Sequence, residues 1–246
     1  MNTKIKYLIF TITLIAFIAL CVFLEVNPSP KHQVRVEFIS HSPDNLVDGD
    51  SIKKMVEKST DSTHNDSLSH RLLEIEKDIA HNPYIEQALV YAEPSGEILV
   101  KIKEHTPLYR VIGKNTDYYV SRDGSHMPLL YGQGIDIPLV SGEIDSLSHI
   151  DVVSVIDAMT KDPFFQDIFM GIDISRYNKG NGHGYTLTAS TRLQDIKVIL
   201  GDGSYIDEKI ENFKALYTYL IKEDRLKEYK IVNLEFVDYL VLQRKK

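Results

Sequence analysis

The sequence of 246 residues contains a single cysteine, Cys21. One cysteine excludes an intramolecular disulfide and any metal site built from a cysteine cluster. Basic residues are also few, since 28 Lys and Arg stand against 35 Asp and Glu and the formal net charge is −7. General binding to a phosphate backbone needs a basic face. We therefore expect no nucleic-acid partner.

Sequence motifs for catalysis are missing as well. No GxSxG or SxxK nucleophile motif occurs, and the nine histidines follow no zinc signature such as HExxH. We interpret the histidines, among them His64, His70 and His81, as surface residues. The glycine-rich residues 180–184 lack the Lys-Ser/Thr of a phosphate-binding loop and lie between two predicted strands, which favours a hairpin. The sequence thus predicts no enzyme, cofactor, metal or small-molecule substrate.

One long hydrophobic run is present, residues 7–24, and it contains no charged side chain. A helix of this length spans roughly 27 Å, close to the thickness of a bilayer core. Lys4 and Lys6 precede the run, so the positive-inside bias favours a cytoplasmic N-terminus. We predict a cytoplasmic tail over residues 1–6, a transmembrane helix over residues 7–24 and a linker over residues 25–33.

The alternative interpretation of this run is a cleaved signal peptide. A small-x-small cleavage site is expected after the apolar stretch, but the residues there are Phe23, Leu24, Glu25 and Val26. An uncleaved anchor therefore fits better. The rest of the chain is then expected on the far side of the membrane, held to it by a single pass.

The first part of the chain after the linker, residues 34–105, contains both strand-like alternation and helix-like spacing of apolar residues. Apolar residues alternate in a strand that starts at Val34, and Leu68, Leu72, Ile75 and Ile79 share one stripe of a helix. The predicted elements are strand 34–39, helix 50–58, helix 68–79, strand 87–91 and strand 98–104. Two helices on one face of a three-stranded sheet form an α+β unit.

The second part, residues 106–246, is predicted to be a strand-rich domain that carries two helices. Asp123-Gly124 indicates a hairpin, and Ser204 with Asp207 resembles a capping box before a helix. The inner face of that helix is predicted to hold Ile206, Ile210, Phe213, Leu216 and Leu220. Another helix is predicted around residues 152–159. Strands are predicted at 108–112, 118–121, 127–130, 168–174, 185–189, 196–200, 231–235 and 239–243. The fold class is α+β throughout.

Short motifs occur in a fixed order along the two parts. They are Asn82 to Ile85 with Ala88 and Val90; Glu104; Pro107 to Arg110; Tyr118 to Gly124; Met127 to Leu129; Pro138 to Gly142; Leu200 and Gly201 with Lys209, Phe213 and Tyr217; and Ile231 to Leu234. With the order of the predicted segments, these motifs resemble the FtsQ/DivIB family of bacterial cell division proteins along nearly the whole chain.

The resemblance implies a POTRA domain over residues 34–105, an FtsQ-like β domain over residues 106–246, and a role as a non-enzymatic divisome scaffold. It also implies FtsB- and FtsL-like partners and regulation of septal peptidoglycan synthesis. The anchor is then expected in the cell inner membrane and the two folded domains in the periplasm. In the family, FtsB adds to the end of the β-domain sheet. The chain departs from the family at Glu235, where relatives can carry a basic residue; a salt bridge of that type is then either absent here or reversed. The implied partner-binding residues are Phe236, Tyr239, Leu240, Val241, Leu242 and Gln243.

Physical reasoning supports such a site, because a last strand has one free row of N–H and C=O groups that can pair with an incoming strand. The alternative is that one face of this strand is ordinary core and the other is covered by loops. Two other functions stay open. An anchored component of outer-membrane protein assembly or secretion could use the POTRA-like domain for strand addition, and an anchored envelope hydrolase is a further alternative that no catalytic motif supports.

Overall fold

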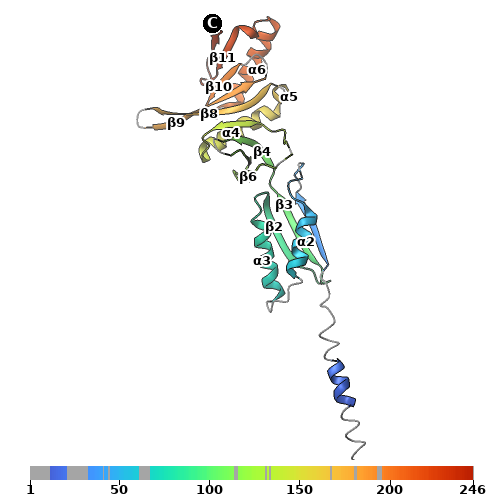
Figure 1. The fold of residues 1–246 in the computed structure, drawn as a ribbon. Coiled ribbons are helices and arrows are strands. Elements are labelled where there is room, and N and C mark those ends of the chain that lie inside the picture. Colours follow the sequence, from blue (N-terminus) through green and yellow to red (C-terminus); the bar gives the residue numbers. More distant parts are fainter. Residues whose placement is uncertain are drawn as a thin grey trace, which may run out of the picture. The chain divides into compact units, whose positions relative to one another are not determined.

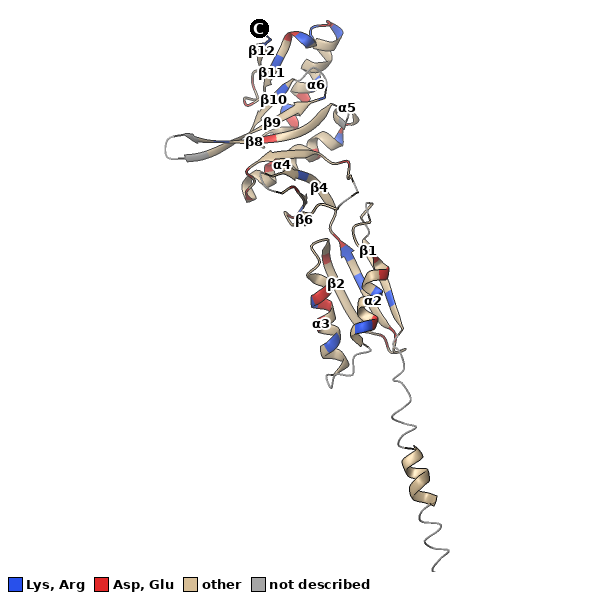
Figure 2. Cartoon of the chain, in the orientation of Figure 1, with Lys and Arg blue, Asp and Glu red and all other residues tan. Residues whose placement is uncertain are grey.

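The computed structural model describes residues 12–20, 33–40, 42–43, 45–60, 67–113, 116–130, 132, 134–166, 168–179, 182–192 and 196–245. The chain divides into two compact units, and each is described by itself. The first unit contains residues 1–39, 48–80 and 87–102, and the second contains residues 103–246 together with the short segments 40–47 and 81–86. In Figure 2, the positions of Lys and Arg and those of Asp and Glu are distributed over the helices and strands.

Residues 12–20 are helical, and their large apolar side chains are exposed. In the part of the chain that the structure describes, no helix is long and apolar enough to cross a membrane. The rest of the predicted transmembrane segment, residues 7–11 and 21–24, lies outside the described residues. The predicted anchor therefore stays a prediction.

The small sheet has three strands in the order β1-β3-β2, so β1 and β2 are its two edges. Its elements follow the predicted sequence of strand, helix, helix, strand and strand. They are β1 (Val34–Ser40), α2 (Gly49–Thr60), α3 (Leu68–Ala80), β2 (Ile85–Ala92) and β3 (Ile98–Glu104). The stripe of Leu72, Ile75 and Ile79 is buried as predicted, and so is the alternating row of Ile98, Val100 and Ile102 on β3. Figure 1 shows α2 and α3 beside this sheet.

A nine-stranded mixed sheet forms the second unit, in the order β12-β11-β10-β9-β8-β7-β4-β5-β6. The sequence did not predict β7 or the short helix α5. The elements are β4 (Pro107–Ile112), β5 (Tyr118–Ser121), β6 (His126–Pro128), β7 (Leu139–Gly142), α4 (Ser146–Lys161), α5 (Pro163–Gln166), β8 (Phe169–Lys179), β9 (Gly182–Thr191), β10 (Lys197–Gly201), α6 (Ile206–Lys222), a 3-10 helix (Leu226–Glu228), β11 (Tyr229–Asn233) and β12 (Val241–Arg244).

Helices α4 and α6 cover one face of this sheet (Figure 1). Val155 of α4 and Phe213 of α6 pack in one core with strand residues such as Val198 and Val232. Burial of apolar surface contributes a favourable free energy of roughly 25 cal/mol per Å². This burial is the main driving force for packing the helices on the sheet. The other face of strands β10 to β12 carries no helix in the described residues. Only one face of the sheet therefore forms the core there.

The predicted capping box at the start of α6 is wrong. The N-cap residue is Tyr205, which lies in the left-handed region (φ 54°), and its side chain makes no capping hydrogen bond. The Ser204 hydroxyl instead donates to Asp202, and this bond holds the pKa of Asp202 below its usual range. Asp202 is a turn residue, and Asp207 is an acidic residue in the first turn of α6.

Lys209 fastens this end of α6 to the sheet. Its side chain is 1% exposed, and its Nζ donates to the carbonyl oxygens of Leu200 (2.7 Å) and Asp202 (3.2 Å). A buried ammonium needs such acceptors because an unpaired charge is costly away from water. The helix thus begins without a conventional cap because a buried lysine joins it to the end of β10.

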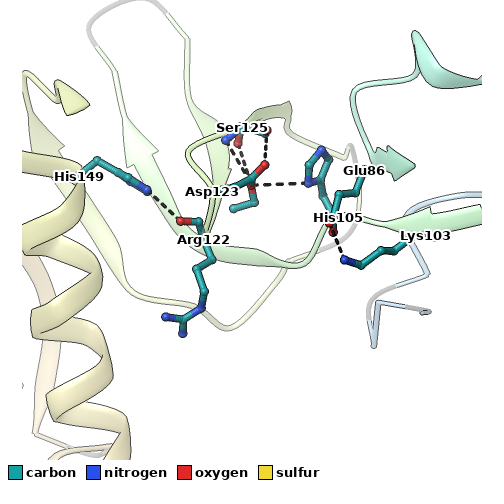
Figure 3. Close-up of polar contacts among 8 residues, drawn as sticks. Glu86, Lys103, His105, Arg122, Asp123, Ser125 and His149 are labelled. Atoms are coloured by element: carbon teal, nitrogen blue, oxygen red, sulfur yellow. Dashed lines mark hydrogen bonds and ion pairs between the residues drawn. The ribbon is translucent and has the colours of Figure 1, made fainter. Parts of the chain in front are cut away.

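The turn between β5 and β6 organises the opposite end of the sheet (Figure 3). Gly124 has a positive φ of 86°, as the predicted Asp123-Gly124 hairpin requires. Asp123 accepts hydrogen bonds from Ser121 and Ser125, and it lies 3.8 Å from Nδ1 of His105. One carboxylate thus links the hairpin to the chain segment that enters β4.

The predicted surface histidines are only partly surface residues. His70 and His81 are exposed, as predicted. His105 is only 8% exposed, so the prediction is wrong for this residue, which packs beside the Asp123 turn. His64 lies outside the described residues.

Replacing Lys209 by Met tests the role of the buried ammonium. Met keeps the length of the side chain but leaves the carbonyl oxygens of Leu200 and Asp202, the first of them buried, without their donor, so we expect the free energy of unfolding to fall by about 2–4 kcal/mol. Urea unfolding followed by circular dichroism measures the change. The exposed Lys222, in the last turn of the same helix, is the matched control, and Lys222→Met should stay within about 0.5 kcal/mol of the parent. Equal stability of the two variants would contradict the assignment.

Candidate partner-docking edge

Strand β12 is the terminal strand of the large sheet and has one neighbour, β11. The two strands are antiparallel, with Val241 opposite Asn233 and Gln243 opposite Ile231. Beyond the strand, the amide of Lys245 donates to the carbonyl of Glu228 (2.8 Å). No strand in the described part of the chain lies on the other side of β12. The last predicted strand is therefore an edge strand, as expected.

The direction of the backbone groups follows from this pairing. Successive residues of a strand point their N–H and C=O groups to opposite sides. The backbone amide of Lys245 points toward β11, so the backbone groups of Gln243 and Val241 point toward it too. The backbone groups of Leu242 and Arg244 therefore point outward. The outer margin of β12 thus offers two donors and two acceptors to an added strand.

The side chains of β12 divide between the two faces of the sheet. Leu242 lies opposite Val232 and packs against the core. Val241, which is 49% exposed, and Gln243 lie on the face without helices, next to Asn233 and Ile231. The interpretation in which one face is core is therefore correct for Leu242, while the outer margin and the open face stay accessible in the described structure.

Strand β12 is shorter than predicted. The sequence predicted residues 239–243, but the strand is Val241–Arg244, and Tyr239 and Leu240 precede it. The reason is the turn that follows β11. The side chain of Asn233 accepts a hydrogen bond from the amide of Glu235 (2.8 Å), which directs the chain away from β11, so pairing resumes only at Val241.

The loop between β11 and β12 is fixed at two points. Leu234 is 1% exposed, and its amide donates to the carbonyl of Ile199 (2.8 Å). Further along, the side chain of Asn212 on α6 donates to the carbonyl of Val237 (3.4 Å). Gly201 has a positive φ of 73°, and a Cβ there would approach Glu235 to 3.1 Å, so glycine lets the loop lie close to the end of β10.

An aromatic pair projects from this anchored loop. The rings of Phe236 and Tyr239 stack with their centroids 4.8 Å apart, yet the two side chains are 46% and 55% exposed. Leu240, also exposed, follows them directly before β12. Exposed aromatic side chains that hold each other in place are typical anchors of protein interfaces. These residues were predicted from the sequence as partner-binding residues. The prediction placed Tyr239 in a strand, whereas the structure places it in a loop, stacked on Phe236.

Charge differs between the two ends of the edge. Glu235 and Asp238 are in the loop before β12. Arg244 at its other end lies near Glu228 (3.8 Å) and above the ring of Tyr229. Glu228 also pairs with Arg225, and this bond raises the pKa of Arg225 above its ordinary value. The edge is therefore acidic where the loop enters and basic where the strand ends.

Comparison with known protein families identifies the family of the domain that contains the nine-stranded sheet. The family described as "FtsQ/DivIB, C-terminal related" matches residues 106–242. The chain belongs to this family. No curated protein matches the chain. The matched segment covers the large sheet from β4 into β12, and it relates the chain to cell division.

Metal chemistry finds no support among the described residues. No group of three or more His, Cys, Asp or Glu side chains there is arranged to hold a metal ion. The partly buried Asp151 is already engaged, because it accepts hydrogen bonds from the hydroxyl of Tyr185 (2.6 Å) and from the amide of Gly203 (2.9 Å). Burial and this carboxylate raise the pKa of Tyr185 above its ordinary value. These contacts hold α4, β9 and the start of α6 together.

Amide hydrogen exchange tests the assigned direction of the β12 backbone. The amide of Gln243 is paired with β11 and should exchange about tenfold more slowly than the outward amide of Leu242, although Leu242 carries the more buried side chain. Exchange rates of the individual amides by NMR give the comparison. Equal protection of the two amides would show that the outer margin is already covered.

Proposed function

We propose that this protein is a non-enzymatic divisome scaffold of the FtsQ/DivIB type, which recruits small anchored division proteins similar to FtsB and FtsL. The observation that carries the proposal is the outer margin of β12, with the stacked Phe236 and Tyr239 beside it. The family match to residues 106–242 supports the link to cell division. Through its partners the scaffold takes part in the control of septal peptidoglycan synthesis.

In this proposal, the partner contributes an extended segment that adds to β12. The outward N–H and C=O groups of Leu242 and Arg244 supply main-chain hydrogen bonds, which give affinity without strict sequence requirements. Phe236, Tyr239 and Val241 add apolar contact area at the same place. Glu235 and Asp238 favour a basic partner residue at the loop end, which corresponds to the reversed polarity considered from the sequence.

The uncharged run of residues 7–24 supports an anchor for the proposed scaffold. Two proteins held to one membrane meet at a high effective concentration, so a modest interface can recruit a partner in the cell. The proposed topology places the N-terminus in the cytoplasm and both folded units in the periplasm. The three-stranded unit with its strand-helix-helix-strand-strand order is proposed to be the POTRA domain.

The double substitution Phe236→Ala and Tyr239→Ala tests the proposed site. Both side chains are exposed, so the fold should persist, and loss of an aromatic anchor pair should weaken capture of the FtsB-like partner by about 30-fold. Binding of the purified partner to the full-length chain by surface plasmon resonance gives the affinity. Leu147→Ala is the control, because Leu147 on α4 is 68% exposed and belongs neither to β12 nor to the loop before it.

The control variant should bind the partner like the parent protein. Undiminished binding by the double variant, in a chain that still melts at the parent temperature, would contradict the assignment of the site. A comparable loss in Leu147→Ala would contradict it as well, because the effect would then not be specific to the edge.

A further inference from the structure

The small sheet has an edge strand of its own, and its surroundings differ from those of β12. Strand β2 is 8 residues long and has β3 as its neighbour. No other strand of the described chain lies on its outer side. Leu89 and Tyr91 are each 39% exposed, so the strand also has apolar surface to offer. Long edges of this kind promote pairing between molecules unless something prevents it.

A side chain from α3 occupies the backbone of this edge. The amide of Val90 donates a hydrogen bond to Oε2 of Glu76 (2.8 Å). The amides of a strand lie in the plane of the sheet and point either toward the neighbouring strand or away from it. An amide that binds a helix carboxylate therefore points away from β3, to the outer side. Figure 1 shows α3 running along this side of β2.

The position of this bond matters for pairing between two copies. Because successive residues alternate, the backbone N–H and C=O groups of Ala88 and Val90 point outward, whereas those of Leu89 and Tyr91 point toward β3. If two copies of β2 pair antiparallel around Leu89, Ala88 of each lies opposite Val90 of the other, and Gln87 lies opposite Tyr91. No like charges face each other in this register. The four central hydrogen bonds of such a pair need both Val90 amides, which Glu76 occupies.

We propose that β2 is a latent docking edge for β2 of a second copy and that Glu76 holds it closed. The carboxylate satisfies the central donor of the edge and places a negative charge where the carbonyl of an incoming strand has to lie. The contact acts as a built-in inhibitor of self-pairing. It is independent of the function proposed for β12, whose residues the test leaves unchanged.

The experiment measures the self-association of the full-length chain by sedimentation equilibrium. Glu76→Ala should open the edge and lower the apparent dimer dissociation constant by about tenfold or more. Glu76→Gln keeps the shape of the side chain and a neutral acceptor, so its dissociation constant should lie between those of the parent and Glu76→Ala. The control is Glu74→Ala on the same helix, since Glu74 is 60% exposed and pairs only loosely with His70 (3.7 Å). It should associate like the parent.

A second substitution identifies the surface that pairs. Leu89 lies on the two-fold axis of the proposed register, so the two ammonium groups introduced by Leu89→Lys, one in each copy, would face each other and repel. Adding Leu89→Lys to Glu76→Ala should return association to the parent value. Association of Glu76→Ala and Glu76→Gln at the parent level would overturn the proposal, and so would dimerisation that Leu89→Lys does not reverse. If Glu76→Ala does not fold, the isosteric Glu76→Gln decides the outcome.

Discussion

The one-sided pairing of β12 is the constraint on which the account depends. Its hydrogen bonds to β11 use the backbone groups of alternate residues and leave those of Leu242 and Arg244 directed outward. Backbone groups need partners or water, so such a margin is either solvated or used by another chain. The anchored loop before β12 then places Phe236 and Tyr239 beside the margin. Backbone direction and loop anchoring thus produce one candidate docking surface.

Strands β2 and β12, one edge strand from each sheet, show contrasting solutions to the same physical problem. At β2, the carboxylate of Glu76 covers an outward amide, which disfavours the addition of a strand. At β12, the side chains next to the margin are aromatic and apolar. The alternative function in outer-membrane protein assembly relies on strand addition by the small domain, and the covered amide of Val90 weighs against such addition at β2. Strand addition is favoured at β12.

Strong periodic patterns predicted much of the fold. The strand Ile98–Glu104 and the stripe of Leu72, Ile75 and Ile79 matched the structure because alternation and helical spacing report directly on a buried face. The start of α6 was mispredicted because a buried Lys209 replaces the cap, a tertiary contact that local sequence does not show. Strand β7 was missed because its four residues are too few to show a period.

For the candidate site, the sequence identified the residues but not their arrangement. An edge strand near the C-terminus was predicted from element order and from the resemblance to a family. The stack of Phe236 on Tyr239 depends on the Asx turn at Asn233 and on the bond from Asn212, which come from separate parts of the sequence. Nothing in the sequence indicated that Glu76 contacts the backbone of β2, because a glutamate on an exposed helix is usually solvated.

Site-specific photo-crosslinking in dividing cells tests the central claim most directly. A photoreactive amino acid at Val241, which is exposed beside the outer margin, should crosslink to a small anchored division protein. The same probe at His126 on β6, the opposite edge of the sheet, should give no such product. A crosslink to that partner from position 126 and none from position 241 would contradict the assignment of β12 as the docking edge.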